Sequence, residues 1–150
     1  GQWSLDRQLL NWTGDVDNAV GAFWGANESW AVAASGALDA RWRQCLRTIY
    51  RKWYAKRTIY IRFAHEFNGN WFDWSVNASN VNDFKIAWRR FHRLVQEELV
   101  AKNKSAKLSW SPNDGGVLPA EQMWPGDQYV DVISVDMYDW WPIRTPQNWN

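Results

Sequence analysis

The segment Ile59–Trp74, which reads IYIRFAHEFNGNWFDW, places one carboxylate among polar and aromatic side chains. That carboxylate belongs to Glu66, and Trp71 and Trp74 follow shortly after it. Burial near aromatic rings raises the pKa of a carboxyl group by desolvation, as a general acid requires. The segment therefore predicts that Glu66 donates a proton, and the alternative is that it only forms a salt bridge with Arg62.

The neighbours of this carboxylate suggest how it would be oriented. His65 and Asn68 carry hydrogen-bonding groups suited either to ligand hydroxyls or to carboxyl groups. A zinc site is not indicated, because Gly69 stands where an H-E-x-x-H motif would have its second histidine. Cys45 is the only cysteine, so a Cys cluster for a metal is excluded. The sequence therefore shows neither of these metal-site motifs.

Tryptophan is unusually abundant, with 14 residues among 150. Large flat rings fill protein cores, and they also stack on the apolar faces of sugar rings. Glu28 and Trp30 are further candidates for a distal ligand subsite. The position of each ring in the chain must decide which of the two purposes it serves.

Short apolar runs that alternate with long amphipathic stretches predict the elements that position these groups. Strands are expected at 18–24, 58–63, 107–110 and 130–135, and helices at 36–56 and 80–103, with Asn80 or Asn82 as the N-cap of the second helix. Strands separated by helices favour parallel βαβ units. Along the second strand Arg62, Ala64 and Glu66 should project to one side, so that Arg62 points inward and pairs with a carboxylate.

Polar and aromatic residues gather just after three of these strands, at 66–71, 110–113 and 136–141. Barrel enzymes place their active sites at the carboxyl ends of their strands, and a complete eight-stranded barrel needs about 250 residues. The pattern predicts an α/β chain that covers about half of a (β/α)8 TIM barrel. A structural protein with incidental tryptophan would not explain this distribution.

Charge and hydropathy exclude other classes of protein. The formal net charge is +1, whereas nucleic-acid binders carry a basic face. No apolar run approaches the roughly 20 residues of a membrane span. The residues from Gly1 onward show no charged-then-apolar leader, and nothing in the sequence indicates an oligomeric state.

Three motifs carry a resemblance to a known family. The run RFAHEFNGNW at 62–71 closely resembles the acid/base motif of glycoside hydrolase family 26, which contains β-mannanases and related endo-glycanases on a (β/α)8 barrel. The run WSPN at 110–113 and the block from WPGDQYVD to DMY at 124–138 are similar to the family's next two strand ends. Their order implies the central portion of the catalytic domain, approximately its third to sixth strands.

The resemblance implies a role for individual residues. Glu66 matches the general acid/base, and Trp71 matches the aromatic wall beside the scissile sugar. Further substrate-binding positions are implied at His65, Asn68, Trp110, Asn113, Asp131, Asp136 and Tyr138. The family's catalytic nucleophile has no match here, because no glutamate follows Glu121. Residues 1–150 are thus expected to form a partial catalytic domain that lacks its N-terminal strands and has its nucleophile beyond Asn150.

The function implied is that of a retaining endo-glycoside hydrolase that cleaves a β-linked polysaccharide. Such an enzyme is expected to need no metal or organic cofactor, because two carboxylates suffice for the reaction. β-Mannan, mixed-linkage glucan, 1,3-linked xylan and bacterial exopolysaccharides all remain open as substrates. The family implies a secreted or periplasmic protein, and the charge balance and hydropathy argue against nucleic-acid and membrane partners. As an isolated piece the chain should be inactive and should associate through unpaired strand edges. The alternative is a non-catalytic, Trp-rich carbohydrate-binding protein or a pseudoenzyme on the same scaffold.

Overall fold

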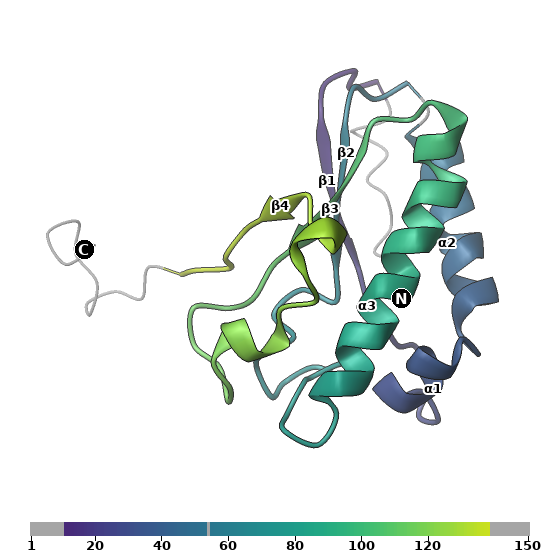
Figure 1. Cartoon of the computed structure of the whole chain (residues 1–150). Helices are drawn as coiled ribbons and strands as arrows, with labels where there is room; N and C mark the ends of the chain where they lie inside the picture. The colour runs from purple at the N-terminus through teal and green to yellow at the C-terminus, as the bar shows by residue number, and fades with distance from the viewer. Residues whose placement is uncertain (1–10, 54, 139–150) are drawn as a thin grey trace, which may run out of the picture.

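Four parallel strands form one sheet, in chain order, in a computed structural model that describes residues 11–53 and 55–138 (Figure 1). The strands are β1 (Val16–Val20), β2 (Ile59–Phe63), β3 (Ala106–Trp110) and β4 (Val132–Ile133). The register pairs Val20 with Phe63, Arg62 with Ser109, and Trp110 with Ile133. The predicted α/β class with a parallel sheet is therefore confirmed.

Helices cover one side of this sheet, where α2 and α3 lie side by side (Figure 1). The helices are α1 (Trp30–Ser35), α2 (Asp39–Lys52) and α3 (Val81–Glu98), and short 3-10 helices follow at η2 (Val100–Lys102), η3 (Ala120–Met123) and η4 (Asp127–Tyr129). The connections β1–β2 and β2–β3 run through α-helices, whereas β3 reaches β4 through η3 and η4. None of the helices in the described ranges is both long and apolar enough to cross a membrane.

Aromatic rings fill the space between the sheet and the helices. Alternate residues of β2 are fully buried, and the last of them, Phe63, stacks on Phe91 of α3 with 3.9 Å between the ring centroids. Trp42 of α2 meets the edge of the same ring at 5.2 Å, and Trp88 lies at 5.8 Å. A large part of the tryptophan content therefore serves the core, where such rings contribute both buried area and edge-to-face contacts.

Several element boundaries differ from the sequence-based expectation for local reasons. The helix expected from residue 36 begins at Asp39, because Gly36 adopts a left-handed backbone (φ 92°) and ends the separate helix α1. The first strand is shifted toward the N-terminus, and β4 pairs over only two residues. Asn80 occupies the N-cap position of α3, but its side chain accepts a hydrogen bond from the Asn77 amide instead of capping the helix.

Trp30 does not line a ligand subsite, contrary to the expectation. It is 2% exposed, and its ring packs against Phe23 and Phe84 with centroid distances of 4.8 and 4.9 Å. Its indole N–H donates to the Trp74 carbonyl at 3.1 Å. Glu28 accepts from the Trp24 amide and pairs with a guanidinium of α2, so it stabilises the loop after β1.

A charge cluster joins α2 to α3 around the buried carboxylate of Glu98. Arg43 and Arg47 of α2 donate to it at 2.9 and 3.0 Å, and Lys102 approaches at 2.6 Å. The hydrogen bond from Arg47 is the largest cause that lowers the pKa of Glu98 from 4.5 to about 2, with Lys102 and Arg43 adding to it against the effect of burial. The carboxylate is therefore charged throughout the ordinary pH range.

We expect Glu98→Gln to lower the free energy of unfolding by about 2 kcal/mol at neutral pH, because the folded state prefers the charged form. The lowered pKa means that this stability is fully present above the ordinary value of 4.5 and is lost as the pH falls toward about 2. Urea denaturation at several pH values measures it. The matched control is Glu97→Gln, whose exposed side chain pairs with Arg43 and should contribute about 0.5 kcal/mol or less. Equal effects of the two variants would contradict the conclusion that the buried Glu98 carboxylate stabilises the fold through its charge.

Candidate active site

A tight turn follows β2 and sets the direction of the acidic side chain. Ala64 and Glu66 both adopt left-handed backbone conformations, with φ of 49° and 55°. The Ala64 amide donates to Val20 at the end of β1, and the Glu66 amide donates to Ser111 just after β3, both at 2.8 Å. Such conformations cost of order 1 kcal/mol each in non-glycine residues, and the surrounding hydrogen bonds offset that cost. The expected alternation of side chains therefore stops at Phe63.

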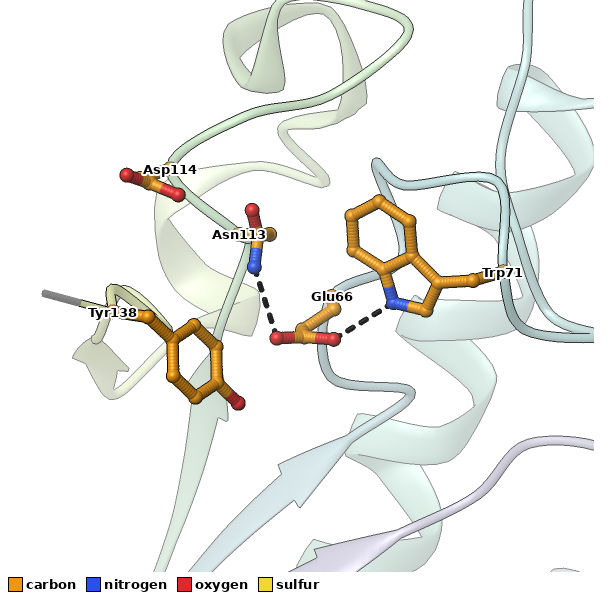
Figure 2. A pocket seen from close by; sticks show the side chains of 5 residues that line it. All are labelled: Glu66, Trp71, Asn113, Asp114 and Tyr138. Atoms are coloured by element: carbon orange, nitrogen blue, oxygen red, sulfur yellow. Dashed lines mark hydrogen bonds between the residues drawn. The ribbon is translucent and has the colours of Figure 1, made fainter. Parts of the chain in front are cut away.

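Glu66 is 7% exposed, and both of its carboxylate oxygens accept hydrogen bonds. The indole N–H of Trp71 donates to Oε2 at 2.8 Å, and the side-chain amide of Asn113 donates to Oε1 at 2.9 Å. Figure 2 shows the carboxylate between these two donors. The cleft around it has a volume of about 340 Å³. The cleft is lined by Glu66, Trp71, Asn113, Asp114 and Tyr138.

Arg62 binds two carboxylates beside this cleft. The sequence predicted that it would pair with a carboxylate. Its Nη1 contacts both oxygens of Asp136 at 2.9 and 3.2 Å, and its Nε contacts Asp17 at 3.0 Å. The alternative in which Glu66 only forms a salt bridge with Arg62 therefore does not hold. Asp136 lies in the extended chain after β4, where it forms a parallel bridge with Asn113.

His65 packs between aromatic rings behind the turn. Its ring centroid lies 5.0 Å from that of Phe72 and 5.7 Å from that of Trp74, and its carbonyl accepts from the Trp74 indole at 2.9 Å. Burial lowers the pKa of the His65 imidazole and the Arg62 guanidinium adds to this, against the opposing effect of nearby carboxylates. The imidazole is therefore uncharged near neutral pH, and its packing against Phe72 and Trp74 stabilises the turn.

Like His65, three further predicted substrate-binding residues do not line the cleft. Asn68 is 3% exposed, and its side chain is bonded to the backbone of Asn113. Trp110 is buried between Phe67 and Trp124, with centroid distances of 5.2 and 5.1 Å. The carboxylate of Asp131 accepts from the Leu108 amide at 2.8 Å, in the pairing of β3 with the start of β4. These side chains stabilise the strands that carry the cleft.

The structure adds one residue to the predicted set. Asp114 lines the cleft beside Asn113, and its amide donates to the Asp136 carbonyl at 3.2 Å. Only its position directly after the WSPN motif could have indicated that Asp114 lines the cleft. Residues 139–141, which belong to the expected third cluster of polar and aromatic residues, lie outside the described residues. The described ranges contain no group of three or more His, Cys, Asp or Glu side chains placed to hold a metal ion.

The arrangement of groups in the cleft is typical of one class of protein. A carboxylate held by two N–H donors lies beside an indole that is 52% exposed, at the carboxyl end of a parallel sheet. Carboxylates that exchange protons with a glycosidic oxygen, next to rings that stack on sugars, are typical of glycoside hydrolases. Residues 47–145 match the family model described as Glycosyl hydrolase family 26, and the chain belongs to this family.

Several named proteins are similar to part of this chain. The chain is 33% identical to Endoglucanase H of Acetivibrio thermocellus over 101 residues, which is 62% of this chain and 10% of that protein. It is 30% identical to a mannan endo-1,4-beta-mannosidase of Bifidobacterium adolescentis over 54% of this chain and 8% of the relative. A beta-1,3-xylanase of a Vibrio species is 25% identical over 86% of this chain and 24% of its own length. The chain thus spans a minor part of each relative.

Solved structures support the fold. The YdhT protein of Bacillus subtilis superimposes with a TM-score of 0.58 and 18% identity, over 72% of this chain and 34% of that one. A GH26 beta-mannanase of Bacteroides ovatus gives a TM-score of 0.57 and 19% identity, over 76% and 36% of the two chains. The described sheet and helices therefore resemble about a third of each of these structures.

The paired contacts of Arg62 generate a prediction on stability. We expect Asp136→Asn to lower the free energy of unfolding by about 1–2 kcal/mol, because Asp136 holds Arg62 through both oxygens and is partly buried. Asp17→Asn is the matched control, since its side chain is 52% exposed and should contribute about 0.5 kcal/mol. Chemical denaturation of both variants measures the difference, and a larger effect at Asp17 would contradict the structure.

Proposed function

We propose that this chain is the central part of the catalytic domain of a retaining endo-glycoside hydrolase, with Glu66 as its general acid/base. The observation that carries the proposal is the double hydrogen bonding of the Glu66 carboxylate in the cleft. A carboxyl group has about four lone-pair sites, and the two N–H donors occupy one on each oxygen. The remaining sites can carry a proton toward a leaving oxygen and later accept one from water.

The retaining mechanism requires a second carboxylate about 5–5.5 Å from the first. We place this nucleophile beyond Asn150, on a later strand, because no glutamate follows Glu121. In this view residues 1–150 supply approximately the third to sixth strands of a (β/α)8 barrel, and the remaining strands complete the active site. The parallel order of the four strands, together with the described helices on one face of the sheet (Figure 1), supports this arrangement. The chain alone is then expected to be inactive.

The walls of the cleft favour a polysaccharide as the substrate. Trp71 exposes about half of its surface while its N–H is held by Glu66, so a ring of fixed orientation is available for stacking. Tyr138 is similarly exposed on the side of the carboxylate opposite Trp71 (Figure 2). With mannosidases and a β-1,3-xylanase among the relatives, we propose a β-linked mannan- or xylan-type substrate and a secreted or periplasmic location.

Substitution of the proposed acid/base tests the reaction. In the complete gene product, Glu66→Gln should abolish hydrolysis of polysaccharide, whose leaving group needs protonation, and should affect activated aryl glycosides less. Steady-state kinetics on both kinds of substrate measure this. Glu121→Gln, a change to an exposed glutamate of η3, is the matched control and should leave both rates unchanged. Equal and small losses on both substrates for Glu66→Gln would contradict the assignment of Glu66 as the general acid/base. Polysaccharide binding without turnover by the wild type would favour a binding protein or pseudoenzyme.

The two proposed duties of Trp71 can be separated by two substitutions. Trp71→Phe retains a ring for stacking but removes the N–H that bonds Glu66, so kcat should fall roughly tenfold with little change in KM. Trp71→Ala removes the ring as well and should also raise KM, by roughly tenfold, because the stacking surface for the sugar is lost. Kinetics on a soluble β-linked oligosaccharide distinguish them. Identical kinetic constants for the two variants would show that the ring does not contact the substrate.

A further inference from the structure

We propose that Asn68 is a positioning residue that fixes the general acid/base through Asn113, an inference that rests on the proposed function of Glu66. Asn68 lies two residues beyond Glu66, but its side chain turns away from the cleft and is 3% exposed. It contacts the loop that follows β3 instead. The route from Asn68 to the carboxylate therefore passes through one intermediate residue, Asn113.

Asn68 holds the peptide of Asn113 at two points. Its Oδ1 accepts from the Asn113 amide at 2.8 Å, and its Nδ2 donates to the Asn113 carbonyl at 2.9 Å. The same N–H and C=O pair would bond a neighbouring strand in a sheet, so the side chain of Asn68 replaces a strand at this place. The carbonyl of Asn68 accepts from Val117 at 2.8 Å, which ties the far end of the loop to the same residue.

The opposite edge of this short extended stretch is also bonded. The Asp136 amide donates to Pro112 at 2.9 Å, and the Asp114 amide donates to the Asp136 carbonyl at 3.2 Å. Asn113 thus lies between the chain after β4 on one side and the side-chain amide of Asn68 on the other. Removal of Asn68 would free one complete edge of this peptide while the other edge stays bonded.

Backbone partners also determine the orientation of both side-chain amides. Asn68 must direct its oxygen to the Asn113 N–H and its nitrogen to the Asn113 carbonyl, because each backbone group plays only one role. Asn113 must direct its own oxygen to the Gly115 amide, 3.0 Å away, which leaves its nitrogen facing Glu66 at 2.9 Å. The backbone contacts of Asn113 therefore determine that its side-chain nitrogen donates to the Glu66 carboxylate, and no ligand is needed to orient it.

Close packing keeps the Asn68 amide in place. A β-carbon added at Gly116 would lie 2.4 Å from Asn68 Nδ2 and 2.7 Å from the Asn68 carbonyl oxygen. Glycine is thus required for the loop to approach the amide this closely. The contact offers a second way to disturb Asn68, because Gly116→Ala displaces the amide without altering a side chain that bonds Glu66.

The test is a double-mutant cycle in the complete gene product. Asn68→Ala should lower kcat on polysaccharide roughly ten- to a hundredfold, because a small displacement of a catalytic group is costly, and should leave KM unchanged. Activated aryl glycosides, which need little protonation, should lose less. Asn113→Ala should give a similar loss, and the double variant should be no worse than either single variant, because both act through one hydrogen bond. Losses that multiply in the double variant would overturn the proposal.

A glycine pair controls for general effects on folding. Gly116→Ala should reproduce the Asn68→Ala pattern, whereas Gly25→Ala, where an added β-carbon meets nothing within 4 Å, should match the wild type. A loss of stability with equal kinetic losses on both kinds of substrate would show a merely structural role and overturn the proposal.

A crystal structure of Asn68→Ala gives a readout that does not require activity. The proposal expects Asn113 Nδ2 to leave its position 2.9 Å from Glu66 Oε1, and an unchanged distance would overturn it. If Asn113 moves but Glu66→Gln retains full activity, the proposed function fails, and the positioning of Asn113 by Asn68 stands. If Glu66→Gln is inactive and Asn68→Ala keeps wild-type kcat, the inference fails and the proposed function stands.

Discussion

The hydrogen bond from the Glu66 amide to the Ser111 carbonyl, together with that from Ala64 to Val20, ties three strand ends into one turn. A chain leaving β2 has no intrinsic reason to adopt two left-handed residues around His65. Partners on β1 and beyond β3 make that conformation favourable, since the amides would otherwise be buried without acceptors. The direction of the carboxylate, the position of the Trp71 indole and the packing of His65 all depend on this turn.

Tryptophan serves two purposes in this chain, and burial separates them. Trp42 and Trp88 pack around Phe63 and are almost fully buried, whereas Trp71 lies open in the cleft with its N–H bonded. The indole N–H explains why tryptophan, and not phenylalanine, can stand at such positions, because it bonds a carboxylate or carbonyl while the ring contacts apolar surface. Trp30 and Trp74 use the same property within the protein, bonding the carbonyls of Trp74 and His65.

The sequence was sufficient to predict which segments form the cleft. Carboxyl ends of parallel strands meet at one edge, so clusters after β2, β3 and β4 had to come together, as Glu66, Asn113 and Tyr138 do. Side-chain directions within those clusters were not predictable. They depend on positive φ at Ala64 and Glu66, which interrupts the two-residue alternation of a strand, and therefore Asn68 turns inward. Trp110 shares a motif with Asn113 yet is buried, because it is still part of β3.

The two walls of the cleft rest on strands with very different support. Glu66 follows β2, which has a hydrogen-bonded neighbour along both edges, whereas Tyr138 follows β4, which pairs over two residues. Local opening requires less free energy where few backbone bonds must break. Amide hydrogens of β2 should therefore exchange with solvent last and those near β4 early.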